Sequence, residues 1–257
     1  MSFTARPYIL AETNWKNIQD TQYDFAVLPW GATEAHNFHL PYATDNYQAD
    51  YIAAASAQLA WAQGARPLVM PCIPFGVNTG QLDIDFCMNL NPSTQYAIIQ
   101  DVAEVITRHG IDKLVLFNGH GGNHFKQMIR ELSVDYPELF VCAINWYQAI
   151  DQHLYFDDLG DHAGEMETSA MMHIAPQFVL PLSEAGDGQA KRFKIAALNE
   201  GWASTPRAWT QVTADTGVGN PAKASAEKGA KYLEATALKI SEFFVELAKA
   251  DIHDLYA

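Results

Sequence analysis

The segment KLVLFNGHGGN, residues 113–123, carries the clearest signal of the fold. After Lys113 it is continuously apolar up to Phe117, which is typical of a strand buried on both faces of a parallel sheet. Gly121 and Gly122 then turn the chain towards a helix expected over residues 123–132. A strand, a glycine turn and a helix in this order predict one unit of an α/β fold.

Similar units precede and follow this stretch. Short apolar runs that favour strands alternate with longer segments that favour helices. We expect strands over 25–29, 67–73, 113–117 and 139–146, and helices over 46–63, 93–109, 123–132, 166–174 and 223–250. Such alternation predicts a three-layer α/β/α fold with a mostly parallel central sheet. Because no linker-like stretch divides the chain, we expect residues 1–257 to form a single domain.

Two of these helices carry apolar stripes that should face the sheet. The helix over 93–109 has its stripe at Ile98, Val102, Val105, Ile106 and His109. The last helix has its stripe at Leu233, Ala237, Ile240, Phe244 and Leu247.

Composition limits the classes of function. The chain has 257 residues, 30 acidic and 16 basic, for a formal charge of −14. This charge repels phosphate backbones, so no nucleic-acid partner is expected. Its three cysteines are too few and too scattered for a disulfide framework. The first 15 residues lack a secretory signal, and no apolar stretch approaches the ~20 residues of a membrane span. We therefore expect a cytoplasmic protein with no membrane partner.

Polar clusters follow the expected strands, and the first comprises Glu34, His36 and Asp45. In an extended chain Glu34 and His36 point to the same side, because side chains alternate with a period of two. Two acids and an imidazole suit Zn²⁺, Mn²⁺ or Fe²⁺. An exposed strand end with assorted acids is the alternative interpretation.

The second cluster surrounds His120, which follows the strand over 113–117 and precedes Gly121, Gly122 and Asn123. Glycines let the backbone approach a ligand, and N–H groups at a helix start favour anionic charge. A phosphate-binding loop is the alternative, although its glycine and lysine motifs are missing. His124 is a second candidate ligand, but an ordinary place on the first helical turn is favoured.

The third cluster contains Asp161, His162, Glu165 and Glu167. Two residues apart on a helix, Glu165 and Glu167 cannot share a face, so at most one is expected in a common site. Acids at a helix start also complement its dipole, which is the simpler interpretation of Asp161 and Glu165.

The three clusters together resemble the creatininase (creatinine amidohydrolase) family. The matching segments are LPWGATEAHNFHLPYATD (28–45), NGHGGN (118–123) and DHAGEMETS (161–169). The resemblance implies a hydrolase with two divalent metal ions. These ions are expected to be zinc, manganese or one of each, and iron is the alternative. It acts on a small-molecule cyclic amide or a related C–N bond. A homo-oligomer, specifically a hexamer, is also implied.

The resemblance further implies a ligand set. Glu34 and His120 would hold one metal, His36 the other, and Asp45 would bridge both. A further metal-binding glutamate of creatininase falls at Gly122 here, so a carboxylate must come from elsewhere.

Glu167 is our candidate for that carboxylate, with Glu165 as its rival. His162 matches the catalytic histidine of the family and would pass a proton to the departing nitrogen. An imidazole suits proton transfer near neutral pH. Asp161 would orient its ring, as acids beside a working histidine commonly do.

The substrate side is implied less closely. Trp146 matches a tryptophan that contacts the substrate in creatininase; the alternative is an aromatic residue of the core or of the rim. The amides of Gly121, Gly122 and Asn123 are candidates to stabilise negative charge on a substrate oxygen. The loop over 155–160 lacks the tryptophan that closes over creatinine, so creatinine is not the expected substrate.

Alternatives remain open. Relatives include a formamidopyrimidine-nucleotide deformylase and a peptide-processing enzyme, and the sequence does not choose between them. A phosphorylated substrate would need basic residues near the site, and Lys126, Arg130, Lys191 and Arg192 are scattered. A non-catalytic metal-binding or small-molecule-binding homologue is disfavoured by His162 and Asp161. A nucleotide-binding α/β protein is disfavoured by its missing phosphate motifs.

Overall fold

The computed structural model describes residues 5–257. Residues 1–4, where the segment tested for a secretory signal begins, lie outside this range. The strands are β1 (Phe25–Trp30), β2 (Pro67–Val69), β3 (Lys113–Asn118) and β4 (Phe140–Asn145). The longer helices are α2 (Thr44–Ala62), α3 (Pro92–Arg108), α4 (Lys126–Asp135), α5 (Glu165–Ile174) and α8 (Ala226–Lys249). The short helices are α1 (Trp15–Gln19), α6 (Ala196–Asn199) and α7 (Trp209–Val212).

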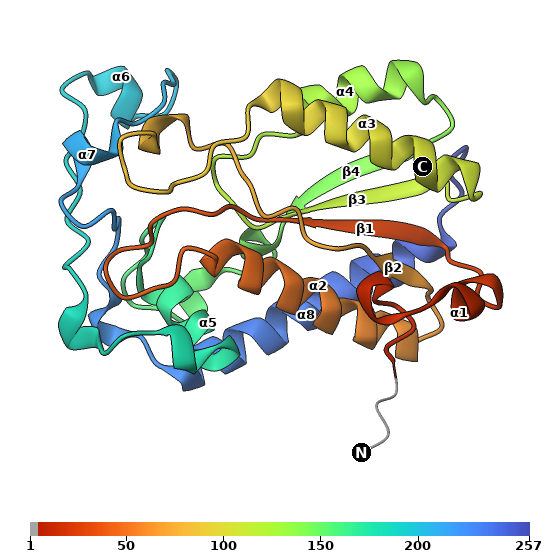
Figure 1. Ribbon diagram of the computed structural model, residues 1–257, viewed down its shortest axis with the longest axis horizontal. Coiled ribbons are helices and arrows are strands. Elements are labelled where there is room, and N and C mark those ends of the chain that lie inside the picture. Colours follow the sequence, from red (N-terminus) through yellow and green to blue (C-terminus); the bar gives the residue numbers. More distant parts are fainter. Residues whose placement is uncertain (1–4) are drawn as a thin grey trace.

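The four strands form one parallel sheet in the order β2-β1-β3-β4. Helices α3 and α4 cover one face, and α2 and α8 cover the other, with α5 beside them (Figure 1). This arrangement confirms the predicted three-layer α/β/α fold. None of the helices in residues 5–257 combines the length and apolar character needed to cross a membrane.

Alternate residues of β1 and β3 enter two separate cores, because successive side chains of a strand point to opposite faces. The core with α2 and α8 contains Phe25, Val27, Val115 and Phe117. The core with α3 and α4 contains Ala26, Leu28, Leu114 and Leu116. Burial on both faces explains why these strands are continuously apolar, as the sequence indicated.

The expected stripe of α8 is buried, but that of α3 is shifted by about one residue. The buried positions of α3 are Gln95, Ile99, Ala103 and Ile106. Val105 is 52% exposed, while Ile98 and Val102 border the core. The apolar surface of this helix is wider than the strip that the sheet covers.

The connections place the functional loops at one point of the sheet. From β1 the chain crosses through α2 to β2 at one edge, and from β3 it crosses through α4 to β4 at the other. These two connections lie on opposite faces, so the direction of winding changes between β1 and β3. Ligands of open α/β sheets bind at such a switch point, beyond the carboxyl ends of the strands. Glu34 follows β1 and His120 follows β3 at this point.

Candidate metal centre

Four elements bring their side chains to the switch point. Glu34 comes from the loop after β1, Asp45 from the first turn of α2, and His120 from the loop after β3. His120 Nδ1 lies 2.8 Å from Glu34 Oε1 and 3.0 Å from Asp45 Oδ2. His36 Nε2 lies 3.1 Å from Asp45 Oδ1. Glu167, on α5, completes the cluster.

The cluster consists of two triads that share one carboxylate. Glu34, Asp45 and His120 form one triad, and His36, Asp45 and Glu167 form the other, with the ligand atoms of each triad within 4.8 Å of one another. A third grouping of Glu34 and His36 with His162 overlaps both. The structure therefore brings all five residues of the implied ligand set together, with Asp45 between the other four.

The ring orientations of the histidines suit metal binding. His120 Nε2 lies 3.1 Å from the Val77 carbonyl oxygen, and His36 Nδ1 lies 3.1 Å from the Glu34 carbonyl oxygen. Because a carbonyl only accepts, these nitrogens carry the ring protons. In the neutral rings the other nitrogens then direct lone pairs at carboxylates. Histidines that bind metals characteristically donate their second ring N–H in this way.

Two buried oxygens of the cluster have no aligned hydrogen-bond donor. They are Glu34 Oε1 and Asp45 Oδ2, the same atoms that lie near His120 Nδ1. His120 Nδ1 carries at most one proton, so it can donate to only one of these two oxygens. Buried acceptors that converge on each other need a positive charge between them. This donor set of oxygen and nitrogen atoms fits a divalent transition metal.

The pKa values show the same need for positive charge. Burial alone would lower the pKa of His36, but the Asp45 carboxylate outweighs it and raises that pKa to about 10. Burial is likewise outweighed at His120, where Glu34 and Asp45 raise the pKa well above its usual value. Burial raises the pKa of Glu167 with only partial compensation from His36 and His162. Either protons or metal ions must therefore balance the buried carboxylates.

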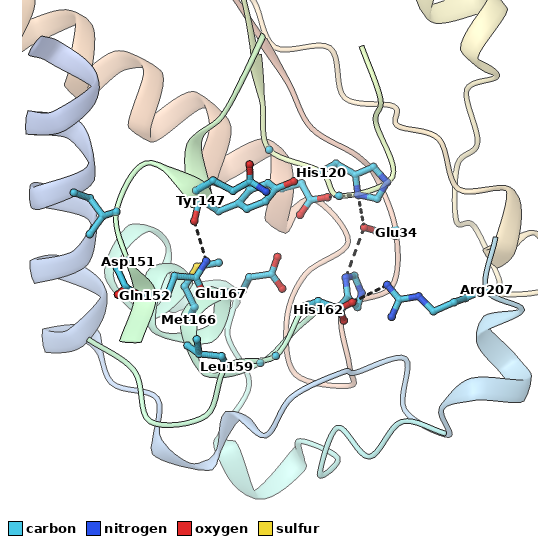
Figure 2. A pocket seen from close by; sticks show the side chains of 18 residues that line it. Glu34, His120, Tyr147, Asp151, Gln152, Leu159, His162, Met166, Glu167 and Arg207 are labelled. Carbon is cyan, nitrogen blue, oxygen red and sulfur yellow. Dashed lines mark hydrogen bonds and ion pairs between the residues drawn. The ribbon is translucent and has the colours of Figure 1, made fainter. Parts of the chain in front are cut away.

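His162 stands beside the cluster in a fixed orientation. Its Nε2 donates to the Ala35 carbonyl at 2.8 Å, and its Nδ1 lies 3.8 Å from Glu34 Oε1. The ring packs against His36 at a centroid distance of 4.2 Å and against Trp209 at 4.8 Å. Figure 2 shows Glu34 between His120 and His162. The ring is thus oriented with Nδ1 towards the cluster.

The structure separates the two rival glutamates of α5. Glu167 reaches the cluster, where its Oε2 also accepts a hydrogen bond from the Ala163 amide. Glu165 is fully buried elsewhere: it pairs with Lys228 and accepts hydrogen bonds from the amides of Asp157 and Asp158. Only Glu167 is therefore in a position to supply the carboxylate.

Gly122 has a steric explanation. A Cβ atom at this position would overlap the His120 ring and the Val77 carbonyl. No larger residue fits while His120 keeps its place, so the carboxylate has to come from α5 instead.

Three expected contacts are corrected by the structure. Trp146 begins the short helical turn Trp146–Gln148 after β4 and is buried in the core beside Tyr232. Tyr147, the next residue, lines the cavity instead. The backbone amide of Asn123, predicted to face a substrate oxygen, donates instead to the His120 carbonyl at 3.2 Å, and its buried side chain accepts from the Val77 amide.

The third correction concerns Asp161. Its Oδ2 accepts a hydrogen bond from Arg207 Nη2 at 2.8 Å, whereas the ring N–H of His162 is held by the Ala35 carbonyl. Asp161 therefore does not have the orienting contact that the sequence predicted.

A cavity opens onto the cluster in two lobes of about 640 and 440 Å³. Glu34, His120, Gly121, His162 and other residues line both lobes, while Gly122 lines the smaller one only. Their size is that of pockets for drug-sized ligands.

Sequence reasoning missed several residues of this site. Gln81 donates to Glu34 Oε2, and Tyr147, Arg207 and Trp209 line the cavity. These residues occur outside the three motifs, and no local pattern marks them.

Comparison with known proteins places the chain in a family. The family model "Creatininase: Creatinine amidohydrolase" matches residues 11–244. The chain belongs to the creatininase family. Amidohydrolases that act on C–N bonds and a peptide peptidase are among its members.

Three similar proteins illustrate the family. A protein of Bacteroides fragilis NCTC 9343, crystallised as a candidate creatinine amidohydrolase, is 44% identical with a TM-score of 0.92, covering 99% of this chain and 100% of that one. Creatinine amidohydrolase of Pseudomonas putida is 29% identical over 60% of this chain and 65% of its own length. Mycofactocin precursor peptide peptidase of Mycolicibacterium smegmatis is 25% identical over 60% of this chain and 59% of its own length. The matches thus span less than two thirds of these two curated relatives.

Two solved creatininases share the fold at 24% identity. One is a Zn–Zn form with a TM-score of 0.76, and the other is an Mn form with a TM-score of 0.78. The match with the Zn–Zn form covers 96% of this chain and 100% of that one, and the match with the Mn form covers 95% and 99%, respectively.

Proposed function

We propose that this chain is a metal-dependent amidohydrolase with a dinuclear centre. Glu34, Asp45 and His120 would hold one divalent ion, and His36, Asp45 and Glu167 the other. The observation that carries this proposal is the shared carboxylate of Asp45 between two convergent triads. The Zn–Zn and Mn forms of the related creatininases support these two metals, with Fe as an alternative.

When bound, such ions lower the pKa of water towards neutrality and polarise the substrate carbonyl. The chain supplies the proton transfer. His162 Nε2 keeps its proton on the Ala35 carbonyl, so Nδ1 is the nitrogen that exchanges protons. Facing the cluster, Nδ1 would take up a proton during attack and deliver it to the departing nitrogen. Gly121 lines the cavity and remains our candidate backbone contact for the substrate oxygen.

The cavity supports a substrate larger than creatinine. A small cyclic amide would occupy only a fraction of lobes of about 640 and 440 Å³. We propose an amide C–N bond in a larger molecule. A short peptide is the second candidate, supported by the size of the cavity and by the mycofactocin precursor peptide peptidases among the relatives.

We further propose that the protein acts in the cytoplasm as a single-domain homo-oligomer, specifically a hexamer. The resemblance to the family supports the hexamer, which sedimentation velocity would measure directly.

The central test replaces the shared ligand. Asp45→Asn should abolish stoichiometric binding of both ions and turnover with it, as measured by elemental analysis after reconstitution with Zn²⁺ or Mn²⁺. Turnover is assayed on cyclic amides, formamides and short peptides. Asp158→Asn, at an exposed carboxylate, is the control and should keep both ions. Two tightly bound ions in Asp45→Asn would contradict the proposal.

A further inference from the structure

Arg207 is a cation in an otherwise acidic cavity. Both lobes of the cavity are lined by its side chain, and no other lysine or arginine in residues 5–257 lines either lobe. The larger lobe alone contains five carboxylates, those of Glu34, Asp45, Asp151, Asp161 and Glu167. Within the described residues, Arg207 is thus the one side chain at this cavity whose positive charge depends neither on a histidine proton nor on a bound metal.

The fold fixes the position of Arg207. Its guanidinium lies over the Trp209 ring, 4.8 Å from the centroid, and the same ring packs against His162. Its backbone carbonyl packs so closely on Gly80 that a Cβ atom at Gly80 would overlap it. Trp209 thus contacts both Arg207 and the proposed proton-transfer residue, and Figure 2 shows the Arg207 side chain directed towards His162.

Asp161 already shows the kind of group that Arg207 binds. Arg207 Nη2 donates to the Asp161 carboxylate at 2.8 Å, with side-chain exposures of 35% and 55%. Ion pairs this exposed contribute little, because water and salt screen them. A guanidinium has five N–H donors and matches carboxylate or phosphate oxygens in pairs. An entering anion can therefore displace Asp161 or share the guanidinium with it.

We propose that Arg207 binds an anionic group of the substrate, so that the substrate is an amide bearing a carboxylate or a phosphate. This inference rests on the proposed amidohydrolase function. The scissile amide would lie at the metal cluster, and the anionic group would lie at the junction of the two lobes. Asp151 and Asp161, the two carboxylates of the larger lobe outside the proposed ligand set, would repel such a substrate if Arg207 were absent.

The test measures binding, which does not require turnover. The metal-reconstituted protein is titrated by calorimetry with three probes: hippurate, its neutral counterpart hippuramide, and phenyl phosphate. Hippurate or phenyl phosphate should bind at least about tenfold more tightly than hippuramide, as expected for charge-assisted hydrogen bonds. The probe that binds more tightly identifies the anion as carboxylate or phosphate.

Variants separate Arg207 from the metal ions, which also attract anions. Arg207→Gln should remove the preference for the anion and leave hippuramide binding within about twofold, while Arg207→Lys should retain part of it. Asp161→Asn should have the opposite effect and strengthen anion binding, because it removes the internal competitor. Arg192→Gln, at an exposed arginine that lines neither lobe, is the matched control and should leave the preference unchanged.

The outcomes are distinct. Equal binding of charged and neutral probes, or an anion preference that survives Arg207→Gln, overturns the inference. An anion preference that depends on Arg207 supports it, even if none of the amides tested is hydrolysed. Loss of both metal ions in Asp45→Asn tests the proposed function separately.

Discussion

At the scale of single residues, the identity of the fifth ligand depends on which glutamate of α5 faces the cluster. Glu165 and Glu167 are two positions apart, so they project about 200° apart around the helix axis. Glu167 meets His36 and Asp45, while Glu165 meets Lys228 on α8. Each carboxylate thus faces a different neighbour, and Glu165 could reach the cluster only if α5 rotated about its axis.

Glu167→Gln should lower the metal content from two ions to one and abolish turnover, because an amide is a poor ligand in place of a carboxylate. Glu165→Gln should retain both ions but lower the free energy of unfolding by about 1–3 kcal/mol. The glutamine oxygen can still accept from the amides of Asp157 and Asp158, but the NH2 group then faces the Lys228 ammonium, and the ion pair is lost. Elemental analysis and denaturant unfolding measure the two effects. Metal loss in Glu165→Gln with retention in Glu167→Gln would reverse our assignment.

At the scale of elements, α8 is the helix that closes the lower layer under the sheet (Figure 1). Its apolar stripe was readable from the sequence because every member repeats at helical spacing. Phe244 is fully buried and packs edge-on against Phe25 of β1, with ring centroids 5.3 Å apart. The helix contacts α2 and α5, which carry Asp45 and Glu167.

Phe244→Ala should lower the free energy of unfolding by about 3–5 kcal/mol, because it leaves a cavity in the core. Metal content per folded molecule should stay at two, since Phe244 lies on the far end of α8 from Lys228. Leu238→Ala, at a half-exposed position of the same helix, should change stability by no more than about 0.5 kcal/mol. Equal losses in both variants would show that packing on β1 is not what anchors α8. Chemical denaturation provides the comparison.

At the scale of the whole molecule, the buried cluster links metal binding to stability. In metal-free protein the pKa of His36 is raised to about 10, so its stabilising contribution is complete below about 6.5 and is lost as the pH rises towards 10. The pKa of Asp45 is lowered by its histidine neighbours despite burial, so its contribution is present above about 3.8 and is lost on acidification.

The melting temperature of metal-free protein should therefore decrease between pH 6.5 and pH 9. In this range a histidine such as His36 keeps its proton in the folded state but loses it in the unfolded state, so each such histidine lowers the free energy of unfolding by about 1.4 kcal/mol per pH unit. Added Mn²⁺ should raise the melting temperature more at pH 8 than at pH 6, because metal and protons compete for the same nitrogens. Calorimetric melts with and without a chelator measure this difference. A metal effect that is equal at both pH values, or larger at pH 6, would count against the cluster as the binding site.

The amino-acid pattern was enough to predict the succession of strands and helices, the mostly parallel sheet and the three polar clusters that follow its strands. Local periodicity specifies the elements, and parallel strands bring the loops at their carboxyl ends to one edge of the sheet. The tertiary packing settles which face of α3 is covered, because that depends on where the helix rests on the sheet. It also decided that Trp146 enters the core and that Arg207 enters the cavity. Such contacts join segments far apart in the chain, where sequence spacing carries no information about distance.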